Sequence, residues 1–204
     1  MAQQPPYYPQ AQGQRPPPQK KTSGCLIAII VLVAVGVPML GVMAALGIYG
    51  MKKYISAAKS AEAKNTIGAI TRAAVASYER DTMIAGKPAH RLCSSAIPVP
   101  RAVPKGMKYQ PSTAAGADFD NGSPTAGWPC LRFSMSSPMY YQYHYQQGSG
   151  WVAPSIAPGP DGFEAAAQGD LDGNGVNSKF ARTGKVVNGS VVVSTDMLIE
   201  DEFE

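Results

Sequence analysis

The longest apolar stretch of the chain lies near its N-terminus, where residues 25–49 read CLIAIIVLVAVGVPMLGVMAALGIY and include no charged side chain. A helix of this length rises about 37 Å, which is enough to cross a bilayer core of about 30 Å. A core helix of a soluble protein would show polar positions at every turn, and a secretory signal has a shorter apolar core of about 7–15 residues. The pattern therefore predicts a single transmembrane helix at 25–49.

Three residues inside this stretch are candidates for helix packing. Pro38 lacks a backbone donor and is expected to kink or loosen the helix. Gly36 and Gly41 have no side chain, so another helix can approach closely there. Small residues are also ordinary in membrane helices, and both interpretations stay open.

After the apolar stretch, residues 50–84 are predicted to continue the helix as an amphipathic segment. Alanine is abundant here, and no proline occurs before Pro88. Apolar positions recur every three or four residues and form one stripe. The stripe consists of Ala63, Ile67, Ile70, Ala74 and Ser77 or Tyr78. Gly86 and Pro88 are expected to end the helix, and the stripe needs a partner that buries it.

The remaining residues, 85–204, are predicted to form a loop-rich β-sheet domain. Prolines are frequent in 87–130, which predicts loops with short extended pieces. Strands are predicted at 131–135, 140–145, 151–153, 163–168 and 186–193. Period two places Tyr141, Tyr143 and Tyr145 on one face, and Asn188-Gly189 suits a type I′ hairpin turn. The expected fold class is therefore α+β, with an antiparallel sheet packed on the amphipathic half of the long helix.

The two ends of the chain differ from this folded part in composition. Residues 1–24, MAQQPPYYPQAQGQRPPPQKKTSG, are rich in proline and glutamine. Such a segment cannot bury enough apolar surface to fold, so a disordered tail or leader is expected. The acidic C-terminal segment 196–204 is expected to be mobile.

Charge is unevenly distributed along the chain. Residues 50–108 hold 11 basic and 3 acidic side chains, whereas residues 109–204 hold 4 basic and 11 acidic ones. One interpretation is a subunit whose basic end meets the acidic end of a neighbour, and the other is chance clustering of solvated side chains. The net charge of +4 gives no basis for nucleic-acid binding.

Catalysis is not expected from this sequence. Two histidines and three cysteines leave few ligands for a transition-metal site, and no phosphate loop, Gly-x-Ser-x-Gly or His-Glu-x-x-His motif occurs. His90 and His144 have no acid–nucleophile partners close in sequence. His144 alternates with the tyrosines and is interpreted as a residue on the sheet surface.

Several short motifs flank and follow the apolar stretch. They are Lys20-Lys21 and Gly24 before the uncharged helix, the run YISAAKSAEAKN at 54–65, Ile67-Gly-Ala-Ile70, and Ala-Ser-Tyr78-Glu79. Over about residues 20–84 this layout resembles a type IV pilin or a type II secretion pseudopilin. The resemblance implies a structural subunit of a pilus or secretion pseudopilus that assembles through its N-terminal helix. Its partners would be the membrane, other pilin-like subunits and the pilus or secretion machinery.

The same resemblance implies a location and a candidate processing site. The chain would be a single-pass protein of the inner (cytoplasmic) membrane, with its C-terminal head in the periplasm or on the cell surface in a fibre. Processing would separate Gly24 from Cys25. The family usually has a glutamate at the fifth position after this site, but Ile29 stands there and 25–49 holds no acid. The chain is then either a cleaved, atypical subunit or an uncleaved, membrane-anchored binding module with a pilin-like head.

Cys93 and Cys130 are the two cysteines of the 85–204 region. In an oxidising compartment a disulfide between them would staple the proline-rich loops and contribute about 3–4 kcal/mol by loop-closure entropy. Two free buried thiols are the alternative. A bridge would support a location of the head outside the cytoplasm.

Residues 170–178, DLDGNGVNS, match the first half of a calcium-binding loop. Such loops place oxygen ligands at positions one, three and five and a glycine at position six. The candidate ligands are Asp170, Asp172, Asn174, Val176 and Ser178. Position twelve is Ala181 instead of a glutamate, so Asp161 or Glu164 would have to complete a Ca²⁺ site. A tight turn of Asx and glycine residues between strands is the alternative, and no other cofactor is expected.

Overall fold

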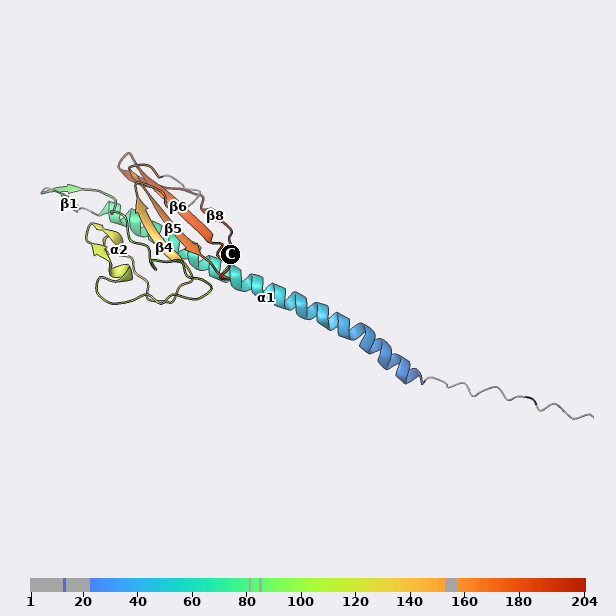
Figure 1. Cartoon of the computed structure of the whole chain (residues 1–204). Helices are drawn as coiled ribbons and strands as arrows, with labels where there is room; N and C mark the ends of the chain where they lie inside the picture. The colour runs from blue at the N-terminus through green and yellow to red at the C-terminus, as the bar shows by residue number, and fades with distance from the viewer. Residues whose placement is uncertain (1–12, 14–22, 81, 85, 153–157) are drawn as a thin grey trace, which may run out of the picture. The chain divides into compact units, whose positions relative to one another are not determined.

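The computed structural model describes residues 13, 23–80, 82–84, 86–152 and 158–204 of the chain. Its architecture is α+β, with one long N-terminal helix and an antiparallel sheet (Figure 1). The chain divides into two compact units at Tyr49 and Gly50. Most of the predicted tail 1–24 lies outside the described residues.

Helix α1 runs from Gly24 to Glu79 and continues without interruption through Pro38. Its abundant alanines and straight-chain residues favour this length. The prediction of helix up to residue 84 is wrong at its end, because strand β1 (Thr82–Ile84) follows directly and pairs with strand β2 (Lys87–Ala89). Gly86 provides the turn of this hairpin, with a φ of 78° that glycine adopts without strain.

The main sheet has five antiparallel strands, and β4, β5 and β6 lie beside α1 within the unit Gly50–Glu204 (Figure 1). The strands are β4 (Gln142–Gln147), β5 (Gly162–Gly169), β6 (Ser178–Val187), β7 (Ser190–Val193) and β8 (Leu198–Glu200). Their order is β4-β5-β6-β7, and β8 also pairs with β6. The predicted hairpin is confirmed, with Asn188 at a φ of 51° and Gly189 at 77° between β6 and β7.

Two other strand predictions are wrong. No strand forms at 131–135, because Leu131 ends the short helix α2 (Gly127–Leu131) and Arg132 caps it in the left-handed conformation, at a φ of 56°. Trp151 and Val152 are not in a strand either, while Ala153 lies outside the described residues. The loops of 87–130 also contain the 3-10 helix η1 (Asp118–Asp120) and strand β3 (Gly122–Ser123).

The core of the second unit lies between the C-terminal part of α1 and one face of the sheet. Ile67 and Ile70 are fully buried in one cluster with Tyr141, Tyr143 and Tyr145. The three tyrosines share a face because side chains alternate along β4. Burial raises the pKa of each of their hydroxyl groups. The predicted helix stripe and the predicted tyrosine face therefore meet in one core.

Candidate functional site

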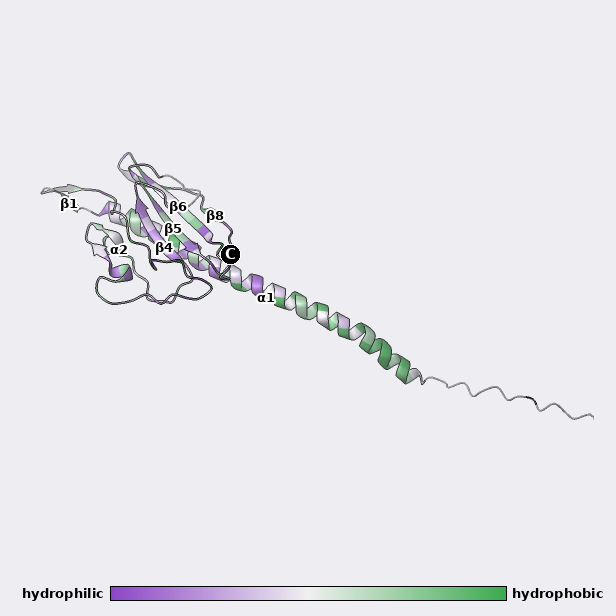
Figure 2. Ribbon diagram, in the orientation of Figure 1, coloured by the Kyte–Doolittle hydropathy of each residue, from purple (hydrophilic) through white to green (hydrophobic). Residues whose placement is uncertain are grey.

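The N-terminal part of α1 carries a continuous apolar surface. Figure 2 shows hydrophobic residues dominating this part of the helix, and its large side chains are more than half exposed, such as Leu32 at 72% and Leu40 at 67%. Among the described residues, α1 is the one helix long and apolar enough to cross a membrane, and none of the residues in its most apolar segment is buried. In water this surface would be unfavourable, so it needs lipid or another apolar partner.

The predicted packing residues lie on this surface and have no partner within the described chain. A side chain built at Gly36 or Gly41 would meet no atom within 4 Å. Pro38 lies inside the unbroken helix. Gly24 and Cys25 lie in its first turn, where Cys25 is exposed and is not part of a disulfide. The first unit thus presents small residues and an apolar surface with room for an approaching helix.

The acidic C-terminal segment is fixed in place, so the expectation that it is mobile is wrong. Leu198–Glu200 form β8 on the edge of β6. Glu202 accepts a hydrogen bond from Ser60 Oγ at 3.1 Å and forms an ion pair with Lys64. The hydrogen bond from Lys64 lowers the pKa of the Glu202 carboxyl. The segment is therefore part of the folded unit.

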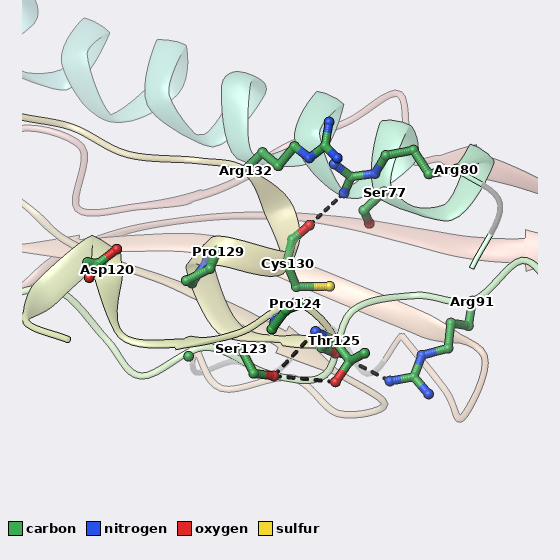
Figure 3. Close-up of a pocket in the computed structure, with 11 residues that line it drawn as sticks. Ser77, Arg80, Arg91, Asp120, Ser123, Pro124, Thr125, Pro129, Cys130 and Arg132 are labelled. Atoms are coloured by element: carbon green, nitrogen blue, oxygen red, sulfur yellow. Dashed lines mark hydrogen bonds between the residues drawn. The ribbon is translucent and has the colours of Figure 1, made fainter. Parts of the chain in front are cut away.

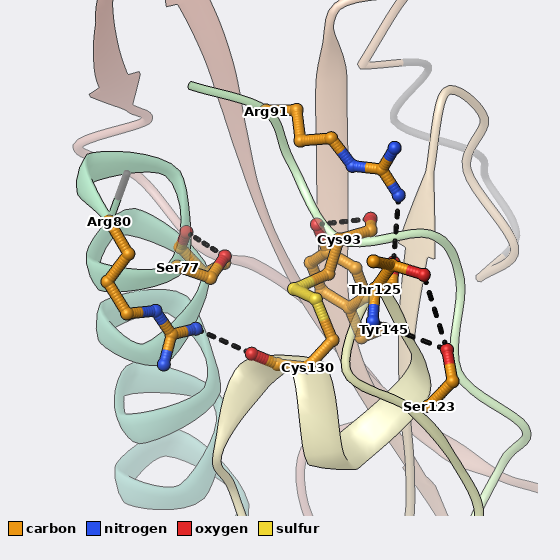
Figure 4. Close-up of a disulfide and its surroundings, with 9 residues drawn as sticks. Ser77, Arg80, Arg91, Cys93, Ser123, Thr125, Cys130 and Tyr145 are labelled. Carbon is orange, nitrogen blue, oxygen red and sulfur yellow. Dashed lines mark hydrogen bonds between the residues drawn. A yellow bond between two sulfur atoms is a disulfide. The ribbon is translucent and has the colours of Figure 1, made fainter. Parts of the chain in front are cut away.

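A disulfide joins Cys93 to Cys130, with Cα atoms 5.9 Å apart (Figure 4). The Tyr145 hydroxyl donates to the Cys93 carbonyl oxygen at 3.2 Å, and the Arg80 guanidinium donates to the carbonyl oxygen of Cys130. The predicted bridge is therefore present. It connects the loop after β2 to α2, close to the C-terminal end of α1. Tyr78 lies in that last turn of α1 and is half-buried.

The acidic loop 170–178 forms a network of turns. The two carboxylate oxygens of Asp170 accept from the backbone N–H groups of Gly173 at 2.7 Å and Gly175 at 3.0 Å. Asp172 Oδ1 accepts from Asn174 N, and Asn174 Oδ1 accepts from Val176 N. These contacts are those of Asx turns.

The residues expected to complete a calcium site do not reach this loop. Glu164 lies six positions before Asp170 along β5 and its extension, which corresponds to about 20 Å of extended chain, and Asp161 lies farther away in the same direction. Glu164 also has partners of its own within the sheet. The Ser178 hydroxyl is buried and donates to the Gly169 carbonyl oxygen at 2.9 Å. Among the described residues, no group of three or more His, Cys, Asp or Glu side chains is arranged to hold a metal ion.

Replacing Asp170 by alanine is expected to destabilise the second unit by about 1–3 kcal/mol, because a buried acceptor of two backbone donors is lost. Replacing Asp172, which is exposed, is expected to cost less than half of that amount. If the loop is a turn, the melting temperature of each of the three proteins is the same in Ca²⁺ as in EDTA. A rise of the melting temperature with Ca²⁺ that Asp170→Ala abolishes would restore the calcium interpretation.

One buried polar pair was missed by the sequence analysis. His144 Nε2 lies 3.1 Å from Glu164 Oε1, and both side chains are fully buried. The same oxygen accepts from the backbone N–H groups of Trp151 and Val152 at 2.8 and 3.1 Å. The interpretation of His144 as a surface residue is therefore wrong, because the segment with Trp151 covers it.

The ionisation of this pair is set by its surroundings. Burial lowers the pKa of His144, and the hydrogen bond and charge of Glu164 oppose that shift. The Trp151 ring packs against the imidazole with centroids 4.1 Å apart. Within the described residues, His144 Nδ1 and Glu164 Oε2 have no hydrogen-bond partner. Its contacts within the described residues are those of a structural clamp on the segment with Trp151 and Val152.

No protein-family model, curated protein or solved structure matches this chain.

Proposed function

We propose that the chain is a pilin-like structural subunit of a type IV pilus or a type II secretion pseudopilus, which assembles through its N-terminal helix. The observation that carries this proposal is the exposed apolar surface of α1 before Tyr49, next to a stripe of the same helix that is buried under a sheet. The C-terminal part of the helix packs in the core of the second unit, and the N-terminal part has an apolar surface that needs lipid or another apolar partner to cover it.

The small residues of the apolar part support assembly in addition to anchoring. Between helices in lipid there is little hydrophobic driving force, so close packing at small residues decides whether helices associate. Gly36 and Gly41 offer open backbone for such contacts. The absence of charge from 25 to 49 allows the same segment to lie in a bilayer before assembly.

The proposed location is the inner membrane, with the head in the periplasm or in a fibre on the cell surface. The Cys93–Cys130 disulfide supports a head outside the cytoplasm, because such bridges persist in oxidising compartments.

A second function has one observation in its favour. Ile29 occupies the position at which the resembled family usually has a glutamate, and 25–49 contains no acidic residue. In that family the glutamate is thought to neutralise the new N-terminal ammonium of a neighbour inside the fibre. Without it, an uncleaved chain that stays in the membrane and uses its head to bind a ligand is the alternative.

Mass spectrometry of the native N-terminus, combined with recovery of filaments from sheared cells, tests these functions. A processed subunit yields a chain that begins at Cys25 and sediments with the sheared filaments. An intact N-terminus in the membrane fraction, with no chain in the filaments, supports the anchored binding module. Full-length protein that stays in the aqueous fraction without detergent would contradict both.

A further inference from the structure

A cavity of about 460 Å³ lies beside the disulfide, between the end of α1 and the loops around α2 (Figure 3). Residues from three parts of the chain line it, among them Ser77, Arg80, Arg91, Asp120, Thr125 and Arg132. The disulfide holds two of these parts together, because Cys130 itself lines the cavity and is bonded to Cys93. The shape of the cavity is therefore fixed by the fold and the disulfide of the second unit.

Three guanidinium groups line this cavity. Arg80 directly follows α1, Arg91 lies in the loop after β2, and Arg132 is the left-handed residue that caps α2. Figure 3 shows the guanidinium groups of Arg80 and Arg132 next to each other. Burial lowers the pKa of Arg80, and the positive charge of Arg132 lowers it further. Arg91 and Arg132 are exposed and Arg80 is half-buried, so an anion from solution can reach these like charges, and their mutual repulsion favours its binding.

None of the three arginines is in an ion pair within the described chain. Asp120 is the one acid in the lining, and its Oδ2 accepts from the backbone N–H of Gly116 at 2.7 Å.

The bonds that the arginines do make use few of their donors. Arg80 donates to the Cys130 carbonyl oxygen, and Arg91 donates to the Thr125 carbonyl oxygen at 3.4 Å. Each guanidinium has five N–H donors, so most of them are available. A purely structural role explains Arg80, but it does not explain Arg132, whose guanidinium takes part in none of the side-chain hydrogen bonds within the described residues.

We infer that this cavity binds an oxyanion group, either a carboxylate or a phosphate. Planar guanidinium groups bind both through paired, charge-assisted hydrogen bonds. The group can belong to a free anion or to an acidic protein segment. This chain contains such a segment, since residues 196–204 read DMLIEDEFE.

The acidic segment of the same molecule cannot fill the cavity. Glu202 is bonded to Ser60 and Lys64 on α1, and Lys64 precedes Arg80 by roughly 24 Å of helix. Glu204 is also held elsewhere, because its Oε2 accepts from Asn174 Nδ2 at 2.7 Å in the loop 170–178. A carboxylate from this segment would therefore come from a second copy of the chain.

The test uses the full-length protein in detergent micelles and isothermal titration calorimetry in phosphate-free buffer at near-physiological salt. The probes are inorganic phosphate and a synthetic peptide DMLIEDEFE, and a peptide with amides in place of its carboxylates serves as a probe control. Arg91→Gln and Arg132→Gln are each expected to weaken binding about tenfold, which is the loss of one charge-assisted pair. Because glutamine meets the same backbone strain as arginine at the φ of residue 132, this exchange leaves the loop geometry unchanged.

Arg101→Gln is the matched control, since Arg101 is exposed, carries the same charge and lies outside the cavity. It is expected to leave binding unchanged, and Arg132→Lys, which keeps the charge but loses the planar fork, is expected to weaken it. Saturable binding of the acidic peptide alone identifies a protein carboxylate as the ligand, and binding of phosphate identifies a free anion. If neither probe saturates, or if Arg101→Gln weakens binding as much as Arg132→Gln, the site does not exist. Because binding is measured on solubilised protein, this result is independent of whether the chain forms filaments.

Discussion

Replacing Val33 and Val37 together by arginine is expected to remove the chain from the membrane fraction that resists alkaline extraction, and from sheared filaments. The two residues are one helical turn apart on α1 and are both more than half exposed. An arginine near the bilayer centre costs about 2.5–3.5 kcal/mol, so the pair costs about 5–7 kcal/mol. The secondary structure is unaffected, because arginine is a good helix former.

A matched control separates this effect from a general effect of added charge. Met51 and Ile55 have the same spacing on the same helix and are exposed, but they lie beyond the apolar stretch. Met51→Arg combined with Ile55→Arg is expected to leave extraction resistance unchanged. If the Val33/Val37 variant resists extraction as well as the unchanged protein, residues 25–49 are not embedded in lipid, and the proposed function is wrong.

The long helix could be predicted from the sequence because two strong signals agree along it. An uninterrupted apolar run indicates one part, and a stripe with a spacing of three and four residues that includes Ile67 and Ile70 indicates the other. The hairpin at Asn188-Gly189 was predictable for a local reason, since few residue pairs adopt two consecutive positive φ angles.

The segment 127–135 could not be predicted because its structure depends on distant contacts. Helix α2 is only five residues long, too short to be stable alone. It is held by the disulfide at Cys130 and by Trp128, which is fully buried and donates to the Ile97 carbonyl oxygen at 2.8 Å. The apolar residues after Leu131 suggested a strand, but the left-handed Arg132 turns the chain away.

The three arginines of the cavity escaped prediction for a related reason. Arg80, Arg91 and Arg132 are separated by loops whose paths the sequence does not specify. Arg80 and Arg91 were visible only as part of the basic excess over 50–108, and Arg132 lies in the acidic region 109–204. Their convergence depends on the disulfide and on the end of α1, and no local pattern encodes it.

The pairing of His144 with Glu164 was hidden by strand register. His144 lies opposite Ala166 in the β4–β5 ladder, which places Glu164 at the diagonal position two residues away. The alternation of side chains along the strand correctly placed His144 on the face opposite the tyrosines. It could not reveal that the segment containing Trp151 and Val152 folds over the other face of the sheet.

Replacing Glu164 by alanine is expected to destabilise the second unit by about 3–5 kcal/mol. The substitution leaves three donors without their acceptor: His144 Nε2 and the backbone N–H groups of Trp151 and Val152. Breaking a buried, hydrogen-bonded pair of this kind has a cost of that size. Glu164→Gln keeps an oxygen acceptor and is expected to cost less. Chemical denaturation followed by tryptophan fluorescence measures the difference.

Glu200→Ala is the control for this substitution. Glu200 lies on β8 of the same sheet, and its partly exposed carboxylate is 3.2 Å from Lys179 Nζ. An exposed pair of this type contributes about 0–1 kcal/mol. Equal losses for Glu164→Ala and Glu200→Ala would contradict the role of Glu164 as a clamp on the covering segment.

The same pair makes the stability of the second unit depend on pH. In the unfolded chain a histidine binds a proton near pH 6.5, whereas burial lowers the pKa of His144 in the folded state. The unfolded state therefore binds more protons below about pH 6.5, so the contribution of His144 is complete above that pH and decreases as the pH falls, by up to about 1.4 kcal/mol per pH unit. His144→Gln is expected to remove this slope between pH 6.5 and 5. Parallel stability curves for the two proteins would show that His144 does not titrate on unfolding, and that the pair is held by its hydrogen bonds alone.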